Sequence, residues 1–346
     1  MKPSILLIIT TIILNNAVSQ TIDSSFGKNG IVITELSQNV DALHAMILQP
    51  DGKIIASGFS NSRLTLVRYN TTGLLDSTFG TNGIVRTNFS CGFGSPYKVS
   101  LQANGKIILL GMNSSTMLLT RYNTDGTSDS SFGLNGIANI SHSIPGSFCS
   151  SMKLLADGKI IVTGSTGVNG IFVIKYNTNG ALDASFGTQG FTNTIMPAGY
   201  TSIAVGDLCI DGSGSIFIAA NITDMTGGYA NFCFFKYHSN GMLNTSFGTN
   251  GFVLSGIGGA GMSNYPAPIQ LQKDGKILLA GTANNNFSVA RYNTDGTLDK
   301  TFNTTGITTT YVGGIYRKCA DMLIEPNGKI VLAGHIGDDF GSIRFN

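Results

Sequence analysis

The chain has 346 residues, of which 42% are hydrophobic and 12% are charged, with 21 Lys and Arg against 19 Asp and Glu. This length and apolar content allow a sizeable core, and the near-balance of charge argues against nucleic acid or an anionic membrane surface as a partner. The 45 glycines, with plentiful Asn, Ser and Thr, favour many short strands joined by turns.

The first residues, 1–19, have the features of a secretory signal peptide. A positive start precedes the apolar run Ile5–Leu14, and small residues, the last being Ser19, fit the positions before a signal-peptidase site. The run is too short to span a bilayer comfortably, and the alternative is a buried N-terminal strand. We expect cleavage after Ser19. The mature chain, residues 20–346, is then secreted, periplasmic or at the cell surface, without a membrane span.

Residues 20–346 are filled by a repeat that three markers identify. A Ser-Phe-Gly-x-Asn-Gly motif, or a close variant, recurs at intervals of 53 to 61 residues around Phe26, Phe79, Phe132, Phe186, Phe247 and Phe302. A tight turn of the Asp-Gly-Lys type recurs at Gly52, Gly105, Gly158, Gly214, Gly275 and Gly328. A cation followed by an aromatic residue recurs at Arg68, Arg121, Lys175, Lys236, Arg291 and Arg344. Six copies in constant order indicate a single domain of six repeats.

Each repeat is predicted to contain four β-strands. In the first complete repeat, apolar or alternating segments separated by turn residues predict strands at 42–48, 53–57, 64–69 and 84–87. No segment has a convincing helical period. Four strands in a repeat of about 50 residues are typical of a propeller blade. The predicted fold is therefore an all-β, six-bladed β-propeller with four-stranded blades.

The two ends of the repeat array predict how the propeller closes. The mature chain begins with a fourth strand, Gly30–Thr34, and stops at a third strand, Arg344–Asn346. Pairing of Ile31–Thr34 with Ser342–Phe345 would build the last blade from both termini and remove an open sheet edge. We therefore expect a ring that is closed by the N-terminal strand.

Three stretches of the chain resemble a known family of repeats. Residues 49–54 are Gln-Pro-Asp-Gly-Lys-Ile, residues 246–251 are Ser-Phe-Gly-Thr-Asn-Gly, and residues 291–299 are Arg-Tyr-Asn-Thr-Asp-Gly-Thr-Leu-Asp. They resemble the delta-60 repeat family of bacterial extracellular β-propeller-type repeats. The resemblance covers nearly all of the mature chain and implies a secreted or surface propeller, but it implies no activity. The fourth repeat departs most, since Ser213-Gly214-Ser215 replaces Asp-Gly-Lys and Asn244 replaces an aspartate.

The charges that recur in the repeats are predicted to be structural. Most third-strand cations are followed by an aspartate, at Asp76, Asp129, Asp183 and Asp299, with Asp23 in the closing blade. We interpret this aspartate as bonded to the turn or paired with the cation, and the recurrent Phe as a wedge between blades. Calcium is the alternative, because residues 293–299 alternate oxygen-bearing side chains, although this spacing also suits an Asx-turn. We expect no cofactor and no metal.

Residues that do not recur are the candidates for a binding site. Counted back from the Asp-Gly turn, the third and fifth positions are apolar in every repeat, as in Leu48 and Met46, which predicts a packed interface between blades. The sixth and seventh positions vary, and first strands line the channel of a propeller. With the loops that enter these strands, they supply the candidate ligand-binding residues His44, Tyr97, Lys98, Tyr200, Asp207, Tyr265, Tyr316, Arg317 and Asp321. The alternative is a water-filled channel with aromatic residues that pin the loops.

No sequence motif identifies an enzyme or a metal site. The four His residues have no metal-ligand spacing, and nucleophile-elbow, Walker and HExxH motifs do not occur. We expect an exported, monomeric, non-catalytic binding or interaction module whose ligand, a glycan or a protein, lies on the loop face. One alternative is a secreted carbohydrate-active hydrolase or lyase that uses channel carboxylates. Another is a structural surface protein.

Overall fold

The computed structural model describes residues 22–38, 41–90, 98–112, 116–138, 147–167, 170–225, 230–257, 268–284, 286–311, 313, 317–337 and 339–346. In these ranges the chain forms strands and turns and contains no helix. Consequently, none of the described segments is an apolar helix of the length needed to cross a membrane.

Four of the sheets have four antiparallel strands each. The first sheet contains β1 (Asp41–Leu48), β2 (Ile54–Ser60), β3 (Arg63–Tyr69) and β4 (Ile84–Ser90). The third contains β8 (Phe148–Leu154), β9 (Ile160–Thr166), β10 (Gly170–Tyr176) and β11 (Phe191–Ile195). The fourth contains β12 (Tyr200–Ile210), β13 (Ile216–Asp224), β14 (Ala230–Tyr237) and β15 (Phe252–Leu254). The fifth contains β16 (Ile269–Leu271), β17 (Ile277–Ala283), β18 (Asn286–Tyr292) and β19 (Ile307–Thr310).

Two sheets have three strands each among the described residues. The second sheet contains β5 (Lys98–Leu101), β6 (Ile107–Met112) and β7 (Met117–Tyr122). The sixth contains β20 (Arg317–Ile324), β21 (Ile330–Ile336) and β22 (Asp339–Phe345). In the second sheet, a bridge between Thr120 and Ile137 stands where a fourth strand would begin. The all-β prediction is confirmed, and the four strands predicted for the first complete repeat lie within a few residues of β1 to β4.

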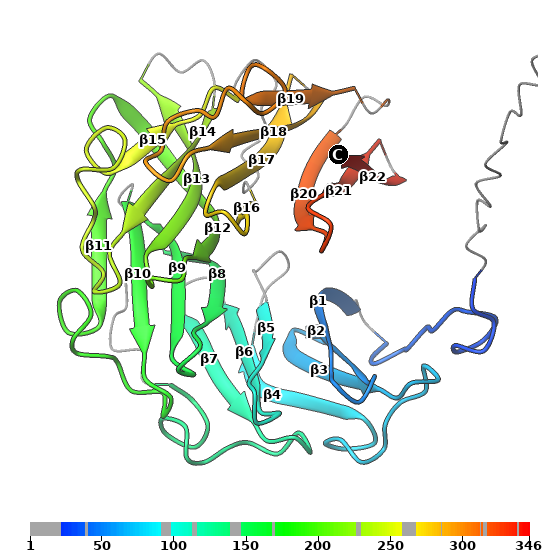
Figure 1. The fold of residues 1–346 in the computed structure, drawn as a ribbon. Coiled ribbons are helices and arrows are strands. Elements are labelled where there is room, and N and C mark those ends of the chain that lie inside the picture. The colour runs from blue at the N-terminus through cyan, green and yellow to red at the C-terminus, as the bar shows by residue number, and fades with distance from the viewer. Residues whose placement is uncertain are drawn as a thin grey trace, which may run out of the picture.

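The six sheets are arranged around a common centre, with the first strand of each sheet innermost (Figure 1). These first strands contact one another in chain order, β1 with β5, β5 with β8, β8 with β12, β12 with β16, and β16 with β20. This is the arrangement of blades in a β-propeller. The first and sixth sheets lie on either side of an opening in the ring (Figure 1).

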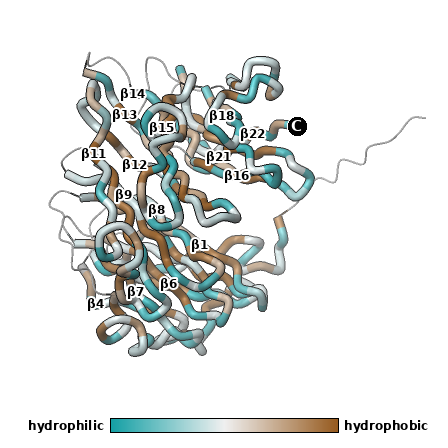
Figure 2. The backbone as a smooth tube through the Cα atoms, turned by 60° about the vertical axis from the view of Figure 1, so that its left-hand side comes forward, coloured by the Kyte–Doolittle hydropathy of each residue, from teal (hydrophilic) through white to brown (hydrophobic). Residues whose placement is uncertain are grey.

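The buried apolar side chains form five clusters, each at a junction between two successive sheets. At the junction of the second and third sheets, Leu110 and Leu119 belong to the same cluster as Met152 and Tyr176. Apolar residues follow the strands, whereas the turns are mostly polar (Figure 2). Because each large buried side chain contributes about 1.5 to 3 kcal/mol, most of the stability of this fold lies between its blades.

The recurrent phenylalanine is a wedge between blades, as predicted. The Phe79 and Phe132 side chains are fully buried. Each wedge packs against a glycine in the turn of the following sheet: at Gly126, whose φ is +84°, an added Cβ would lie 2.9 Å from the ring of Phe79. Both the positive φ and the close approach require glycine at this turn.

The N-terminal segment, residues 22–37, lies against the first sheet in the place of a fourth strand from a preceding blade. The Gly27 amide donates a hydrogen bond to the Thr72 carbonyl over 2.7 Å. The Tyr69 hydroxyl donates to Thr34 Oγ1 over 2.8 Å. The same kinds of contact recur between a fourth strand and the next sheet at other junctions. The segment therefore packs on the first blade, whereas the predicted pairing was with the last blade.

The predicted pairing of Ile31–Thr34 with Ser342–Phe345 is not present among the described residues, where β22 pairs only with β21. The first sheet consequently lacks a cover on one face. Met46 and Leu48, predicted to be packed, are 62% and 70% exposed. The equivalent Met152 is 4% exposed, because the preceding sheet covers it.

Candidate functional site

A cluster of two cations and one aspartate recurs at the turn end of the sheets. In the second sheet, Asp129 Oδ2 accepts hydrogen bonds from Lys106 Nζ over 2.7 Å and from Arg121 Nε over 2.5 Å. The Arg121 guanidinium lies 4.6 Å from the centroid of the Phe132 ring, and its Nη1 donates to the Thr178 carbonyl in the next sheet. Equivalent clusters surround Asp76, Asp183 and Asp299. The cluster therefore joins the strands of one blade to each other and, through an arginine, to the next blade.

These contacts keep the aspartates ionised. Burial alone would raise the pKa of Asp183, but hydrogen bonds from Ser185 and Lys159 outweigh it and bring the pKa to about 2. Hydrogen bonds from a hydroxyl and a lysine likewise hold the pKa values of Asp76, Asp129 and Asp299 well below their usual range. The recurrent aspartate thus makes the cation pair and the turn bonds that the sequence predicted. The turn lysine is a third member that was not predicted.

The fourth sheet has lost two members of this cluster together. Ser215 stands in place of the lysine and Asn244 in place of the aspartate. Lys236 instead places its Nζ 5.0 Å and 5.2 Å from the ring centroids of Phe217 and Phe247. The simultaneous loss of lysine and aspartate is the sequence signal that could have identified the turn lysine as a partner.

Residues 293–299, the calcium alternative, form a turn beside such a cluster. Asp295 Oδ1 accepts from the amide and the hydroxyl of Thr297 over 2.9 Å and 2.7 Å. Asp299 Oδ2 is held by Lys276 and Arg291. Within the described ranges, no three His, Cys, Asp or Glu side chains come together as metal ligands. The contacts are those of an Asx-turn next to an ion pair.

Several inner strands carry a β-bulge close to the candidate positions. The β1 ladder passes from Leu43 to Ala45 and skips His44. The β8 and β20 ladders skip Ser150 and Ala320 at the same position. In β12 the register shifts between Val205 and Leu208, around Asp207. A bulge re-aims the side chains next to it, so the sixth and seventh positions do not simply alternate between channel and interface.

Asp207 and Ser151 connect two neighbouring inner strands. Ser151 Oγ donates to Asp207 Oδ1 over 2.7 Å, which joins β8 to β12. Ser151 is 1% exposed and Asp207 is half-buried. Ser151 was not among the candidates, although it occupies the same sixth position before its turn as Asp207. That shared register was the available signal.

The remaining candidates on inner strands lie on three different strands, β20, β1 and β5. Asp321, exposed in β20, accepts the Met322 amide over 2.8 Å. Burial lowers the pKa of His44, whose ring centroid lies 5.9 Å from that of Phe59. Lys98 is half-buried at the start of β5. The inner strands thus present different polar groups in different blades.

Tyr200 marks the loop face, because it begins β12 where the chain enters the fourth sheet. Its ring meets the Phe252 ring edge-on, with the centroids 6.5 Å apart. Arg317 begins β20, but its side chain lies outside the described structure, as do Tyr97, Tyr265 and Tyr316. The predicted signal peptide, residues 1–19, also lies outside the described residues.

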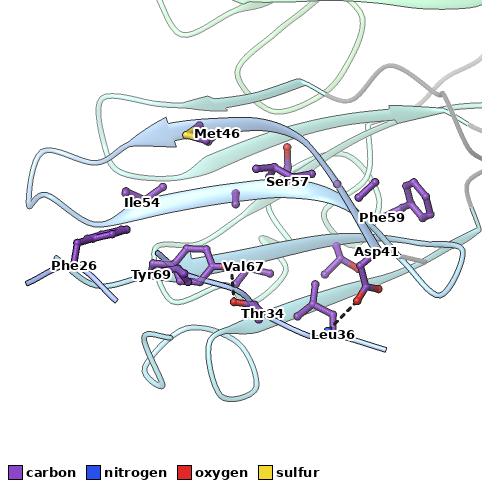
Figure 3. A pocket seen from close by; sticks show the side chains of 16 residues that line it. Phe26, Thr34, Leu36, Asp41, Met46, Ile54, Ser57, Phe59, Val67 and Tyr69 are labelled. Atoms are coloured by element: carbon purple, nitrogen blue, oxygen red, sulfur yellow. Dashed lines mark hydrogen bonds between the residues drawn. The ribbon is translucent and has the colours of Figure 1, made fainter. Parts of the chain in front are cut away.

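A cavity of about 450 Å³ opens on the uncovered face of the first sheet (Figure 3). Ile54 and Val67 line it, together with Phe26 from the N-terminal segment. In the second and third sheets, the equivalents of Ile54 are Ile107 and Ile160, which are fully buried in the clusters between blades. The cavity therefore lies on the face of the first sheet that, in the second and third sheets, is packed against a preceding blade.

The tyrosine that ends the third strand differs in its hydrogen bonding between blades. The Tyr237 hydroxyl donates to Thr194 Oγ1 over 2.9 Å, whereas the buried Tyr176 hydroxyl has no hydrogen-bond partner in the described part of the chain. We expect Tyr237→Phe to destabilise the protein by about 1 kcal/mol, because a satisfied buried bond is lost. Tyr176→Phe is expected to be neutral or stabilising, because it removes a buried polar group. Denaturant midpoints measure both, and equal losses would contradict the difference.

Comparisons with known proteins agree with the repeats. Residues 49–79, 102–132, 155–186 and 272–302 match a family described as "Domain of unknown function (DUF5122) beta-propeller". Each matched segment runs from the first turn of a blade to its wedge phenylalanine. No curated protein matches the chain.

Solved structures are similar to the chain at low identity. An α-L-arabinofuranosidase, Arb93A from Fusarium graminearum, is 9% identical, with a TM-score of 0.50 over 86% of this chain and 90% of that one. AofleA from Arthrobotrys oligospora is 12% identical (TM-score 0.49; 88% and 83% covered). Virginiamycin B lyase from Staphylococcus aureus is 10% identical (TM-score 0.48; 89% and 86% covered). The matched repeats and the arrangement of the sheets support a β-propeller repeat family.

Proposed function

We propose that the protein is an exported, non-catalytic binding propeller whose ligand, a glycan or a protein, lies on the loop face that leads into the inner strands. The supporting observation is a division among the polar residues. The recurrent charges form ion pairs in structural clusters. The inner strands, by contrast, carry His44, Lys98, Asp207 and Asp321 in different blades. Variable polar groups on a constant scaffold are what a specific binding surface requires.

The carboxylates that an enzyme would use are engaged by neighbouring donors. Ser151 holds Asp207, and the Met322 amide holds Asp321. Each donor occupies an oxygen of the carboxylate, which leaves less of that carboxylate free to contact a substrate. These contacts favour binding over a carbohydrate-active hydrolase or lyase.

Thermal unfolding of residues 20–346 with a panel of glycans tests this function. A glycan at a hundred times its Kd adds about 2.7 kcal/mol, which we expect to raise Tm by about 4 °C or more. Tyr200→Ala is expected to abolish the shift, while Asp125→Asn, in an exposed turn on the opposite face, retains it. Product formation that Asp207→Asn abolishes would establish an enzyme instead. No shift with any glycan would contradict glycan binding and leave a protein partner or a structural role.

We also propose that the ring has six blades and that the N-terminal segment closes it. Asp23 and Phe26 stand in the same order and spacing as Asp76 and Phe79. Ser25 Oγ donates to Asp23 Oδ1 over 2.6 Å, just as a threonine hydroxyl does at Asp76. One half of a sixth cluster is therefore already formed at the N-terminus.

The other half of that cluster lies in the sixth sheet. Arg344 faces Val331 across β21 and β22, as Arg68 faces Ile55 in the first sheet. Its side chain is 59% exposed and lies 3.5 Å from Glu325. Closure would bring Asp23 beneath this arginine, place residues 31–33 along β22 and cover the cavity on the first sheet.

A further inference from the structure

At the first two junctions, an arginine at the turn end of one blade forms a hydrogen bond to the next blade. Arg68 Nη1 donates to the Thr124 carbonyl of the second sheet, and Arg121 Nη1 does the same to Thr178 of the third. The residue in this position of the third sheet is Lys175. Its Nζ lies 3.7 Å from Asp183 of its own blade and makes no hydrogen bond to the next sheet within the described chain.

A cavity of about 480 Å³ occupies this third junction. Its walls include the apolar side chains of Leu155, Ile210 and Ile216. Leu155 stands where the first, second and fifth sheets have a glutamine, so the wall is more apolar here than at the other junctions. The volume falls in the range of small-ligand sites, roughly 300 to 1,000 Å³.

The polar rim of this cavity carries an excess of acid. Asp211, Asp157 and Ser239 line it at the solvent side. Lys159 and Lys175 both pair with Asp183, and Asp157 also attracts Lys159, so these two cations face two carboxylates. Asp211 is then a third carboxylate beside the two lysines, which leaves one excess negative charge among these five groups. Its Oδ1 accepts hydrogen bonds from Ser213 and Ser215, which hold it in place.

From this arrangement we propose that the cavity between the third and fourth blades binds an alkylguanidinium group, such as the side chain of an arginine supplied from outside. At the two preceding junctions the protein's own guanidinium donates to the equivalent carbonyl. Here the bound group donates to the Ser239 carbonyl, the counterpart of Thr124 and Thr178, and to the Asp211 carboxylate. Its alkyl chain packs on Leu155 and Ile210. Planar, charge-assisted hydrogen bonding of this kind favours guanidinium over ammonium.

Calorimetric titration of residues 20–346 with agmatine tests this site. Agmatine is expected to bind at least about tenfold more tightly than 1,4-diaminobutane, which matches its double charge without the planar donors. Nα-acetylcitrulline amide, which has the planar shape without the charge, is expected not to bind. An arginine-containing peptide that binds at least as tightly as agmatine would identify a protein as the source of the group. Binding of agmatine alone would identify a free guanidine.

Lys175→Arg is the decisive variant, because it supplies the guanidinium in place. It is expected to lower the agmatine affinity about tenfold or more while keeping or raising Tm. Lys236→Arg, the same change in the fourth sheet, is the matched control and is expected to leave the affinity unchanged. Unchanged binding to the Lys175→Arg protein, equal binding of agmatine and 1,4-diaminobutane, or no binding of agmatine would each overturn the proposal. Since this cavity and the loop face lie at opposite ends of the blades, the glycan experiment neither supports nor weakens it.

Discussion

Deleting residues 22–36 from the mature chain is expected to lower Tm by about 10 °C or more, and to destabilise the whole ring. The deletion removes Phe26 and the Tyr69–Thr34 hydrogen bond from the first blade. In a closed ring it also removes the fourth strand of the sixth blade, so β22 becomes an open edge while the first sheet loses its cover. Deleting residues 20 and 21 alone is the control and is expected to leave Tm unchanged. A single cooperative transition, followed by calorimetry, measures the effect.

Exchanging the charges of Asp23 and Arg344 distinguishes closure of the ring by the N-terminal segment from packing of that segment on the first sheet alone. Asp23 and Arg344 are expected to face each other only when the ring is closed. Asp23→Lys and Arg344→Asp are each expected to lower Tm, and the double exchange to recover part of the loss. Additive losses in the double variant, or a deletion of 22–36 that melts like the intact chain, would refute closure by this segment.

The regular parts of the blades were predictable because they depend on local sequence. Alternating segments and Asp-Gly turns predicted β1 to β4 to within a few residues, and the spacing of Phe79 and Phe132 predicted the wedges. Each of these features is decided within one repeat and its neighbour. Met46 was placed in a packed interface by the same argument, but it is 62% exposed. In the proposed closed ring its cover comes from the far end of the chain, which no local pattern describes.

The candidate site was less predictable for two physical reasons. The bulges around His44 and Asp207 change the direction of the neighbouring side chains. No residue type in these strands predicts the bulges. The Ser151–Asp207 hydrogen bond joins residues that are 56 positions apart, so it depends on how two blades pack. Aligning the repeats on their turns gives both residues the same position, but it does not show that they touch.

Asp129→Asn is expected to cost about 3 kcal/mol, near the lower end for breaking a buried ion pair, because Lys106 keeps some access to water. The change leaves Lys106 and Arg121 without their counter-charge. Their side chains are 29% and 8% exposed, so water can solvate the lysine better than the arginine. Asp125→Asn, at an exposed carboxylate in the next turn, is the control and is expected to cost far less. Guanidinium chloride would screen the charges under study, so urea titration is the appropriate measurement.

The same clusters make the stability of the protein depend on acid pH. The pKa of Asp183 is about 2 in the folded chain, below the ordinary value near 4 for an unfolded aspartate. A carboxyl with a depressed folded pKa stabilises the protein above its unfolded pKa, and this contribution is lost as pH falls through the folded pKa. We therefore expect urea stability to fall steeply between about pH 4 and pH 2, and the Asp129→Asn protein to lose less over that interval than the wild type. Parallel pH profiles for the two proteins would show that Asp129 does not contribute through its charge.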